Sequence, residues 1–378
     1  MRQTMPCGRR ANFRRHRRFG PSAAGLLVLV AGLALSACGG GGGNTAVAPA
    51  PSAAEAKEPA TGSLRVFAYD DTVNKDQLDP FREQNPDLDL KTATFNSDEE
   101  AAAKLAGGFS ADVVEVCLDE AGPLLERNEL RPIDTAGIAE WDKLAFRDEP
   151  DVRQNGKVIM VPLSAGPYGI IYNTEEVPQG VSSYEEMFGD EFAGRMAVEG
   201  SSAVPPLALA ALTLGFDDPF DMSEKQLGEA KDFLLENQSK IRSYPDSDSD
   251  MVNLFKTGEV VVANGGRGTA EEMIEDGVPV KWVAPKEGMW SWVCGLGITS
   301  RAKNIPAAYK LLNYYAGPEA QAISASNGFV ITNPAAAPLV PKQYRETSDP
   351  ASIEGAIPQT EPSDPDAYTR AWQEVRSG

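Results

Sequence analysis

The sequence predicts an α/β protein in which helices cover both faces of a central, mostly parallel sheet. From Ser63 onward, short β-branched and aromatic runs alternate with segments of helical periodicity. This alternation is typical of parallel strands joined by helical crossovers. Size is the second observation: roughly 320 residues follow the leader and tether described below, and a hydrophobic content of 42% is enough for two cores.

The first half of this region predicts three strands, each followed by a helix. Leu78 and Phe81 lie at helical spacing behind Asn74, which we place as an N-cap. Ser97 and Glu100 form a capping-box pattern at the start of the next helix. The predicted elements are strands over 64–68, 88–93 and 111–116, and helices over 74–84, 97–106 and 120–126.

The second half continues the alternation, and no repeat of 20–50 residues indicates a solenoid or propeller. The longest helix is predicted over 223–237, where Leu227, Ala230 and Leu234 share one face. Strands over 158–161 and 169–172 flank a turn-rich stretch. The other predicted elements are helices over 183–188, 206–214, 269–276 and 306–316, and strands over 260–263 and 280–283.

The first 37 residues have the order of an export signal: an arginine-rich stretch, an apolar run over 23–37 and small residues at its end. The run is shorter than the roughly 20 residues that span a bilayer. Its end, Leu35-Ser36-Ala37-Cys38, resembles a bacterial lipobox, so we expect cleavage before Cys38 and lipidation of that residue. An ordinary signal peptide with an incidental Cys is the alternative, and both general secretion and twin-arginine export stay open.

Residues 38–62 predict a flexible tether. Five glycines over 39–43 precede a stretch rich in Ala and Pro with few large apolar residues, a composition that cannot bury enough surface to offset its ordering entropy. A lipid on Cys38 would then hold the folded part near a membrane without inserting it. We expect an exported lipoprotein, in the periplasmic space or on the outer face of the cell membrane.

Removal of the signal sharpens what the composition excludes. Seven of the 35 Lys and Arg residues and the single His, His16, lie in residues 1–37, so 28 basic residues remain against all 55 Asp and Glu, a formal charge of −27. Without His there is no Ser-His-Asp triad and no His-ligated zinc. So acidic a surface also repels nucleic acid. We expect no enzymatic activity, no metal and no cofactor.

Two cysteines remain after the leader and Cys38, namely Cys117 and Cys294. In an exported chain a disulfide is the default, and two separate buried thiols are the alternative.

Two further motifs are weak. The segment 265–268 (GGRG) follows a strand and matches no nucleotide-binding loop, so it is a tight turn or a place where backbone amides approach a ligand. The segment 246–250 (DSDSD) lacks the residues of a calcium loop and predicts a solvated charged loop.

Five segments in order over about 300 residues carry a family resemblance. They are LRVFAYDD at 64–71, GIIYNTEEV at 169–177, SYEEMFGDEFAGRMAV at 183–198, the stretch 258–288 followed by VCGLGIT, and AYTRAWQEVRSG at the end, which resembles the family's closing helix. Together they resemble the extracellular solute-binding proteins of ABC importers, and specifically the spermidine/putrescine-binding group.

The resemblance implies a type II periplasmic-binding-protein fold, with two α/β lobes joined by crossing strands that close on a ligand like a hinge. Lobe 1 would comprise 63–160 and 289–340, and lobe 2 would comprise 161–288 and 341–378. The ligand would lie where the carboxyl ends of the strands meet. Both Cys117 and Cys294 would then lie in lobe 1 near the cleft, which favours the disulfide.

The resemblance also implies a set of cleft residues. Tyr69 and Trp292 match family aromatics, and Asp119 stands where the family has a tyrosine. Ser201, Val204 and Cys294 occupy positions where polyamine binders carry acids, and Arg267 follows a glycine where an aromatic is expected. The predicted ligand-binding residues are Tyr69, Asp70, Asp119, Ser201, Arg267 and Trp292.

Replacement acids are available nearby, at Asp70, Asp71, Asp119, Glu120 and Glu199, although strand ends and helix caps carry such acids in any acidic protein. Trp290 and Trp292 alternate on a strand, so only one can face the cleft, and we favour Trp292. Tyr168 belongs equally well to the core or to the cleft.

The sequence thus predicts a lipid-anchored substrate-binding component of an ABC importer. It would be a monomer that captures a small polar solute, with a polyamine as the first candidate, and delivers it to a permease and its ATPase. An amino-acid-like, carboxylate or phosphonate solute is an alternative, for which Arg267 would supply bidentate contacts. Two different functions also stay open at this point: a ligand-sensing lipoprotein without transport, and an enzyme built on the same fold.

Overall fold

The computed structural model describes Ala54 and residues 58–378, which fall within one compact unit. The predicted signal segment, Cys38 and most of the tether lie outside the described residues. The first strand begins at Gly62, the last residue assigned to the tether. No helix in the described part is long and apolar enough to span a bilayer.

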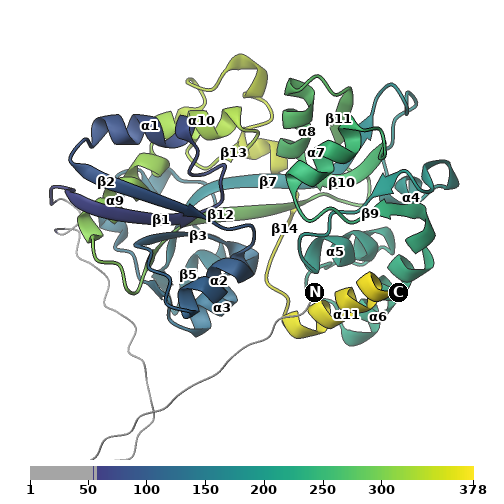
Figure 1. The fold of residues 1–378 in the computed structure, drawn as a ribbon, viewed down its shortest axis with the longest axis horizontal. Helices are drawn as coiled ribbons and strands as arrows, with labels where there is room; N and C mark the ends of the chain where they lie inside the picture. The colour runs from purple at the N-terminus through teal and green to yellow at the C-terminus, as the bar shows by residue number, and fades with distance from the viewer. Residues whose placement is uncertain (1–53, 55–57) are drawn as a thin grey trace, which may run out of the picture. The chain divides into compact units, whose positions relative to one another are not determined.

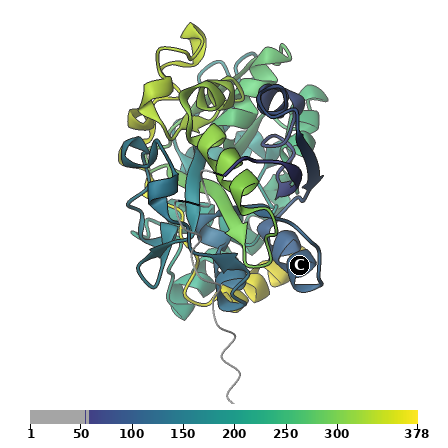
Figure 2. The same ribbon diagram turned by 90° about the vertical axis from the view of Figure 1, so that its left-hand side faces the viewer.

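A single mixed sheet forms the centre of the described residues, with helices on both of its faces (Figures 1 and 2). Its main path runs β2-β1-β3-β12-β7-β10-β8-β9. These strands are β2 (Leu88–Thr94), β1 (Gly62–Ala68), β3 (Val113–Cys117), β12 (Trp290–Thr299), β7 (Met160–Asn173), β10 (Val262–Gly266), β8 (Met196–Ala197) and β9 (Ile241–Ser243). The shorter strands of this sheet are β4 (Leu130–Arg131), β11 (Val280–Val283), β13 (Val330–Ile331) and β14 (Ile357–Pro358), whereas β5 (Arg153–Gln154) and β6 (Lys157–Val158) pair with each other in a separate two-stranded sheet.

The pairing within this sheet is parallel at both ends and antiparallel in the middle. β1 is parallel to β2 and β3, and β8 is parallel to β9 and β10. The long strands β7 and β12 cross between these groups and are antiparallel to each other and to their neighbours β10 and β3. The α/β class is confirmed, and the crossing strands make the sheet mixed.

The expected break between residues 161 and 169 is wrong, because β7 is one continuous strand of 14 residues. Pro162 and Pro167 suggested a turn, since proline lacks the N–H that a ladder needs. In the structure the register against β12 shifts between Cys294 and Gly295, and this irregularity lies next to Pro162. A bulge of this kind accommodates a proline inside a sheet.

The helices follow the predicted caps closely. Asn74 Oδ1 accepts the Gln77 N–H at 2.9 Å, and Ser97 Oγ accepts the Glu100 N–H at 3.2 Å. The capping box is only half formed, because the Glu100 carboxylate accepts the N–H of Asn96 and not that of Ser97. The helices are α1 (Lys75–Gln84), α2 (Asp98–Ala106), α3 (Gly122–Glu126), α4 (Tyr184–Met187), α5 (Val204–Thr213), α6 (Glu224–Glu236), α7 (Asp248–Lys256), α8 (Arg267–Glu275), α9 (Ile305–Ala316), α10 (Pro318–Ser326) and α11 (Pro365–Ser377). Of these, α7 and α10 were not predicted.

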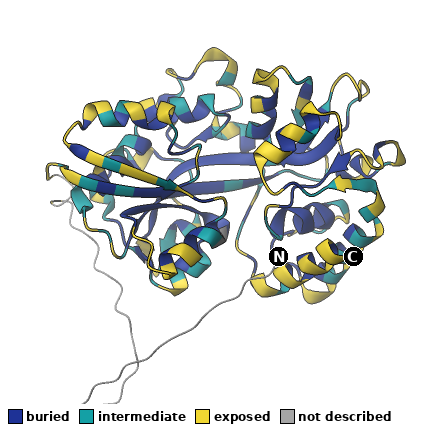
Figure 3. Cartoon of the chain, viewed as in Figure 1, coloured by how far each residue is buried: buried dark blue, intermediate teal, exposed yellow. Residues whose placement is uncertain are grey.

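Buried apolar side chains form two main groups, and the crossing strand β7 contributes to both. Leu163 packs in the first group with side chains of β1, α1 and α9. Ile170 packs in the second with side chains of α5, α6 and α11. The C-terminal segment 341–378 contributes to both groups, with Ile353 in the first and Tyr368 in the second. Figure 3 shows both crossing strands largely buried between exposed helical faces. The proposed lobe boundaries stay a prediction.

The predicted disulfide is present. Cys117 is the last residue of β3 and stands opposite Cys294 of β12 in the antiparallel ladder, with their Cα atoms 3.9 Å apart. The alternative of two separate thiols is therefore excluded in this structure. The bond ties the parallel end of the sheet to a crossing strand.

Candidate functional site

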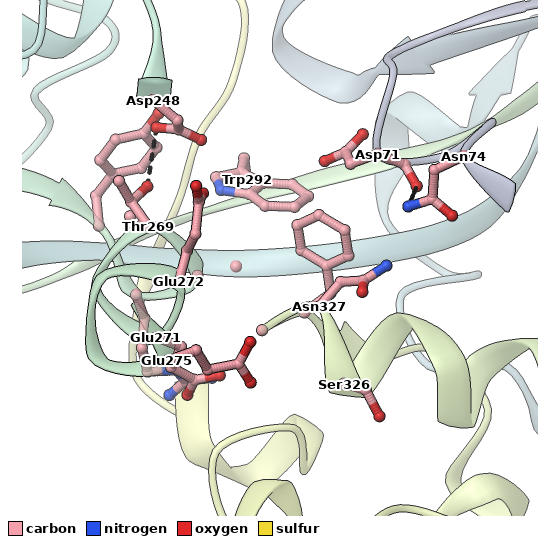
Figure 4. A pocket seen from close by; sticks show the side chains of 17 residues that line it. Asp71, Asn74, Asp248, Thr269, Glu271, Glu272, Glu275, Trp292, Ser326 and Asn327 are labelled. Carbon is pink, nitrogen blue, oxygen red and sulfur yellow. Dashed lines mark hydrogen bonds between the residues drawn. The ribbon is translucent and has the colours of Figure 1, made fainter. Parts of the chain in front are cut away.

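Two adjoining cavities lie between the two groups of strands. The larger, which we call the main cavity, has a volume of about 330 Å³. The second, which we call the α8 compartment, has a volume of about 300 Å³ and is lined by residues along the whole of α8 and by the loop after α10 (Figure 4). The two share a common wall of five residues, namely Asp71, Tyr168, Asp248, Trp292 and Phe329.

The main cavity is strongly acidic. Seven carboxylates line it, and none of the described residues in its wall is Lys, Arg or His. The seven are Asp70, Asp71, Glu115, Asp119, Glu199, Asp246 and Asp248. Carboxylates gathered without a counter-charge favour a cationic ligand, because unpaired charges are costly to hold together away from bulk water.

The order of the strands explains how these acids meet. Tyr69, Asp70 and Asp71 directly follow β1, and Glu115 and Cys117 belong to the end of its parallel neighbour β3. On the other side, Glu199 follows β8 and Asp248 begins the helix after β9, and these two strands are also parallel. The carboxyl ends of parallel strands lie at one edge of a sheet, which is where ligands of α/β proteins bind.

Glu115 organises the floor of the main cavity. Its side chain is 3% exposed and accepts the Tyr69 N–H and the Thr72 hydroxyl, each at 3.1 Å. Burial, and next the charge of Asp71, raise the pKa of Glu115 well above its ordinary value. Because its oxygens already hold the turn after β1, we assign Glu115 a positioning role.

Asp71 and Asp248 face the shared wall from opposite sides (Figure 4). Burial first, and then the charge of Asp70, raise the pKa of Asp71 to about 6, and Asp248 contributes to the same rise. Asp248 accepts the Thr269 hydroxyl at 2.8 Å, and burial raises its pKa as well. A cation between these carboxylates would relieve their mutual repulsion.

Glu199 is a buried acid whose hydrogen bonding is incomplete. The residue is 8% exposed; Oε1 accepts the Ser201 N–H at 2.9 Å, whereas Oε2 is buried without a hydrogen-bond partner. Burial raises the pKa of Glu199 to about 7, against the opposing effect of the Ser201 hydrogen bonds. A buried oxygen of this kind costs free energy until a donor satisfies it.

Aromatic side chains complete the walls. The indole of Trp292 lies against the backbone of Gly166, where an added Cβ would come within 2.6 Å of Cζ2, so only glycine leaves it room. Trp292 also meets Phe329 edge to face at 5.7 Å between ring centroids. Tyr168 stacks on Trp290 at 5.2 Å while lining both cavities.

The structure brings the six predicted ligand residues to these walls. Tyr69, Asp70, Asp119, Ser201 and Trp292 line the main cavity, whereas Arg267 lines the α8 compartment. Trp292 rather than Trp290 faces the cavities, because Trp290 is fully buried. Asp119 accepts a hydrogen bond from the Gln359 amide. Their roles toward a ligand stay predictions, and the Glu120 side chain lies outside the described ones.

Arg267 is held by groups outside the main cavity. Its guanidinium donates to the Thr347 carbonyl and to Ser352 Oγ, the latter at 3.1 Å, and lies 5.7 Å from the ring centroid of Trp282. Its side chain is therefore engaged in joining α8 to the segment around 347–352.

The charged segment 246–250 is exposed as predicted, but its second half is not a loop, because α7 begins at Asp248. Ser247 caps α7 by accepting the Asp250 N–H at 3.1 Å, and this turn places Asp248 in the cavity wall. The signal was present in the sequence, because Ser followed three residues later by an acid is a helix-start pattern. Phe329 and Glu272 were also missed, since packing of the loop after α10 on α8 forms the α8 compartment.

In the part of the chain that the structure describes, no group of three or more His, Cys, Asp or Glu side chains is arranged to hold a metal ion. The carboxylates of the main cavity can instead accept hydrogen bonds from a positively charged ligand, and the aromatic rings can lie against its cationic groups.

Residues 76–351 match the family model described as "Bacterial extracellular solute-binding protein". The putrescine-binding periplasmic protein PotF of Escherichia coli (strain K12) is 27% identical over 347 residues, covering 84% of this chain and 92% of that protein. The spermidine/putrescine-binding periplasmic protein 1 of Haemophilus influenzae is 26% identical over 309 residues, covering 79% and 82%.

Solved structures share the fold. The spermidine/putrescine ABC transporter substrate-binding protein PotD from Streptococcus pneumoniae superposes with a TM-score of 0.72 at 20% identity, covering 84% of this chain and 99% of that one. The Tp0655 lipoprotein of Treponema pallidum gives the same TM-score and identity, with coverage of 84% and 100%. These similarities confirm the type II periplasmic-binding-protein fold.

Proposed function

Because the chain belongs to the bacterial extracellular solute-binding proteins, we propose that the solute it captures for an ABC importer is an organic cation of the polyamine kind. One observation carries the choice of a cation: seven carboxylates and no Lys, Arg or His among the described residues that line the main cavity. The names of the relatives, which specify putrescine and spermidine, support the polyamine class.

The cavity offers both kinds of contact that such a ligand needs. Its ammonium groups would donate charge-assisted hydrogen bonds to Glu199 Oε2 and to the carboxylates of Asp71 and Asp248. Its methylenes would lie on Trp292 and Tyr168, whose ring faces also attract cations by about 0.5–2 kcal/mol each. Glu199 and Asp248 thus compensate for Ser201 and Cys294, which stand where polyamine binders carry acids.

The same charges account for closure on the ligand. Asp71 follows β1 and Asp248 begins α7, so the two acids belong to the two strand groups joined by β7 and β12. In the empty cleft their repulsion opposes closure, whereas a bound dication makes closure favourable. A ligand that interacts better with the closed state shifts the population toward it. We therefore assign β7 and β12 the role of the hinge.

The remaining features complete the proposed role. Lipidation of Cys38 and the tether over 38–62 would keep an exported monomer close to its permease and ATPase. The protein would release its solute unchanged and would not act as an enzyme. The negative charge of the mature chain would also concentrate cations near its surface.

A melting screen tests the proposed ligand class. Selective binding to the folded state stabilises it by RT ln(1 + [L]/Kd), so millimolar spermidine or putrescine should raise the melting midpoint. Glutamate and 2-aminoethylphosphonate should leave it unchanged. A shift with either anionic solute, together with none for the polyamines, would contradict the proposal.

A further inference from the structure

We propose that Arg267 strengthens solute binding without touching the solute, because it latches α8 to the segment 344–352 and so favours the closed cleft. The latch consists of Arg267 and Glu275 on α8 and of Tyr344, Thr347 and Ser352 on the segment. Such a latch acts on closure itself and would serve any solute of the cleft, so it goes beyond the proposed function. It gives Arg267, a predicted ligand residue, a positioning role away from the ligand.

The two halves of the latch are anchored in different parts of the molecule. On one side, Met273 of α8 is buried in the same apolar cluster as Ala197 of β8. On the other side, the Ile331 N–H of β13 donates to the Ser348 carbonyl at 2.9 Å, and Ile353 packs in the first group of buried side chains. Because the crossing strands β7 and β12 lie between the two anchors, opening of the cleft would separate the halves of the latch.

The Arg267 guanidinium makes the central contact. The residue is 6% exposed, and it donates to the Thr347 carbonyl and to Ser352 Oγ, the latter at 3.1 Å. The guanidinium carbon lies 5.7 Å from the ring centroid of Trp282, whose indole N–H donates to the Gly265 carbonyl of β10 at 3.2 Å. Two acceptors on the segment and an aromatic ring fixed to β10 thus hold a planar, forked cation, a geometry that suits arginine and not lysine.

Further contacts engage both ends of α8. The Tyr344 hydroxyl donates to the carboxylate of Glu275, the last residue of the helix. At the first turn, Gly268 lies so close to Gly328 that a Cβ added to Gly328 would come within 2.7 Å of the Gly268 Cα. The whole length of α8 is therefore fitted against the loop after α10 and the segment 344–352.

The latch lies apart from the proposed solute position. None of its five residues is among the described residues that line the main cavity, and Tyr344, Thr347 and Ser352 line neither cavity. Because these residues bond to one another, the latch can form before a solute arrives. It then opposes the repulsion between Asp71 and Asp248 and raises the fraction of closed molecules. The apparent Kd equals the intrinsic Kd divided by the fraction in the binding-competent state, so a larger closed fraction tightens binding.

Two variants remove the central contact from opposite sides. Arg267→Gln removes the charge and the fork, and Ser352→Ala removes one acceptor outside both cavities. Each should weaken spermidine, putrescine and cadaverine by one common factor, because none of these solutes touches the latch. We expect about tenfold for Arg267→Gln, as for losing a hydrogen bond to a charged group, and a smaller loss for Ser352→Ala. Calorimetric titration into the mature protein measures these affinities.

The double variant tests whether the two residues act through one contact. It should bind no more weakly than Arg267→Gln alone, because the first change already removes the interaction that the second one breaks. The matched control is Arg242→Gln, which changes an exposed arginine of β9 that pairs with Glu259 on its own side of the cleft at 2.6 Å and should leave every affinity unchanged.

Solution X-ray scattering without solute gives a second measurement. Both latch variants should have a larger radius of gyration than the wild-type protein and the Arg242→Gln control, because fewer molecules are closed. Melting of each variant checks the fold, and Ser352→Ala keeps the test valid if Arg267→Gln does not fold.

An unchanged radius of gyration, or unchanged affinities for amines that the wild-type protein binds, would overturn the latch. So would additive losses in the double variant. A loss confined to L-ornithine, which is putrescine with an added carboxylate, would also overturn it, because Arg267 would then bind the solute directly. If the wild-type protein binds none of the amines, the proposed function fails, and the radii of gyration still decide whether the latch exists.

Discussion

At the scale of single residues, the main cavity combines side chains that hold the site with side chains left for a ligand. Glu115 is satisfied by Tyr69 and Thr72, whereas Glu199 keeps one buried oxygen without a partner. Tyr69 and Asp70, which the family resemblance assigned to the cleft, line the main cavity just after β1, and their roles toward a ligand stay predictions. The sequence could not distinguish Glu115 from Glu199, since burial and hydrogen bonding are set by neighbours distant in sequence.

The raised pKa of Glu199, about 7, makes polyamine binding depend on pH. A bound cation favours the charged carboxylate, so affinity should rise as the pH increases through about 7 and fall as Glu199 takes up a proton below it. Glu199→Gln should weaken spermidine binding by roughly tenfold or more at pH 8, the equivalent of one hydrogen bond to a charged group. The difference in spermidine affinity between the wild-type protein and this variant should be smaller at pH 6, where wild-type Glu199 is largely neutral.

Titrations of both proteins at the two pH values measure this difference. The matched control is Glu236→Gln, which changes an exposed acid of α6 outside both cavities and should follow the wild-type protein throughout. If the two proteins differ in spermidine affinity by the same factor at pH 6 and at pH 8, Glu199 does not act through its charge.

At the scale of elements, local signals predicted the caps well, and long-range pairing decided the rest. The predicted caps at Asn74 and Ser97 are present because they depend only on residues three positions away. The continuity of β7 was hidden by Pro162 and Pro167, because its stability comes from β12 and β10 on either side. Helix α7 was missed because its first residues are acidic, although Ser247 caps them.

The disulfide between β3 and β12 should stabilise the fold at the edge of the main cavity, which both cysteines line. Replacing both cysteines by serine should lower the free energy of unfolding by about 2–4 kcal/mol, chiefly because the unfolded chain is no longer cross-linked. Urea unfolding followed by tryptophan fluorescence measures this loss.

Reduction of the wild-type protein serves as the control for that variant. A reductant should lower the stability of the wild-type protein to a similar extent and leave the double-serine variant unchanged. Equal stability of the oxidised wild-type protein and the variant would refute a stabilising role for the bond.

At the scale of the whole molecule, two groups of parallel strands bring like charges to the edges of one cleft, and two crossing strands connect them. The fold class could be predicted from the alternation of strand and helix patterns, and the family from five sequence segments that occur in the family's order. The α8 compartment could not, because it forms where Gly268 and Gly328, 60 positions apart in sequence, come together. The lobe boundaries and the lipid anchor stay predictions.

The proposed function requires the cleft to bind an organic polycation through its carboxylates. The most direct measurement is a calorimetric titration of spermidine into the mature protein near pH 7, repeated in two buffers of different ionisation enthalpy. We expect saturable binding with net release of protons, because the cation lowers the raised pKa values of Asp71 and Glu199. The absence of binding, or binding accompanied by net proton uptake, would contradict it.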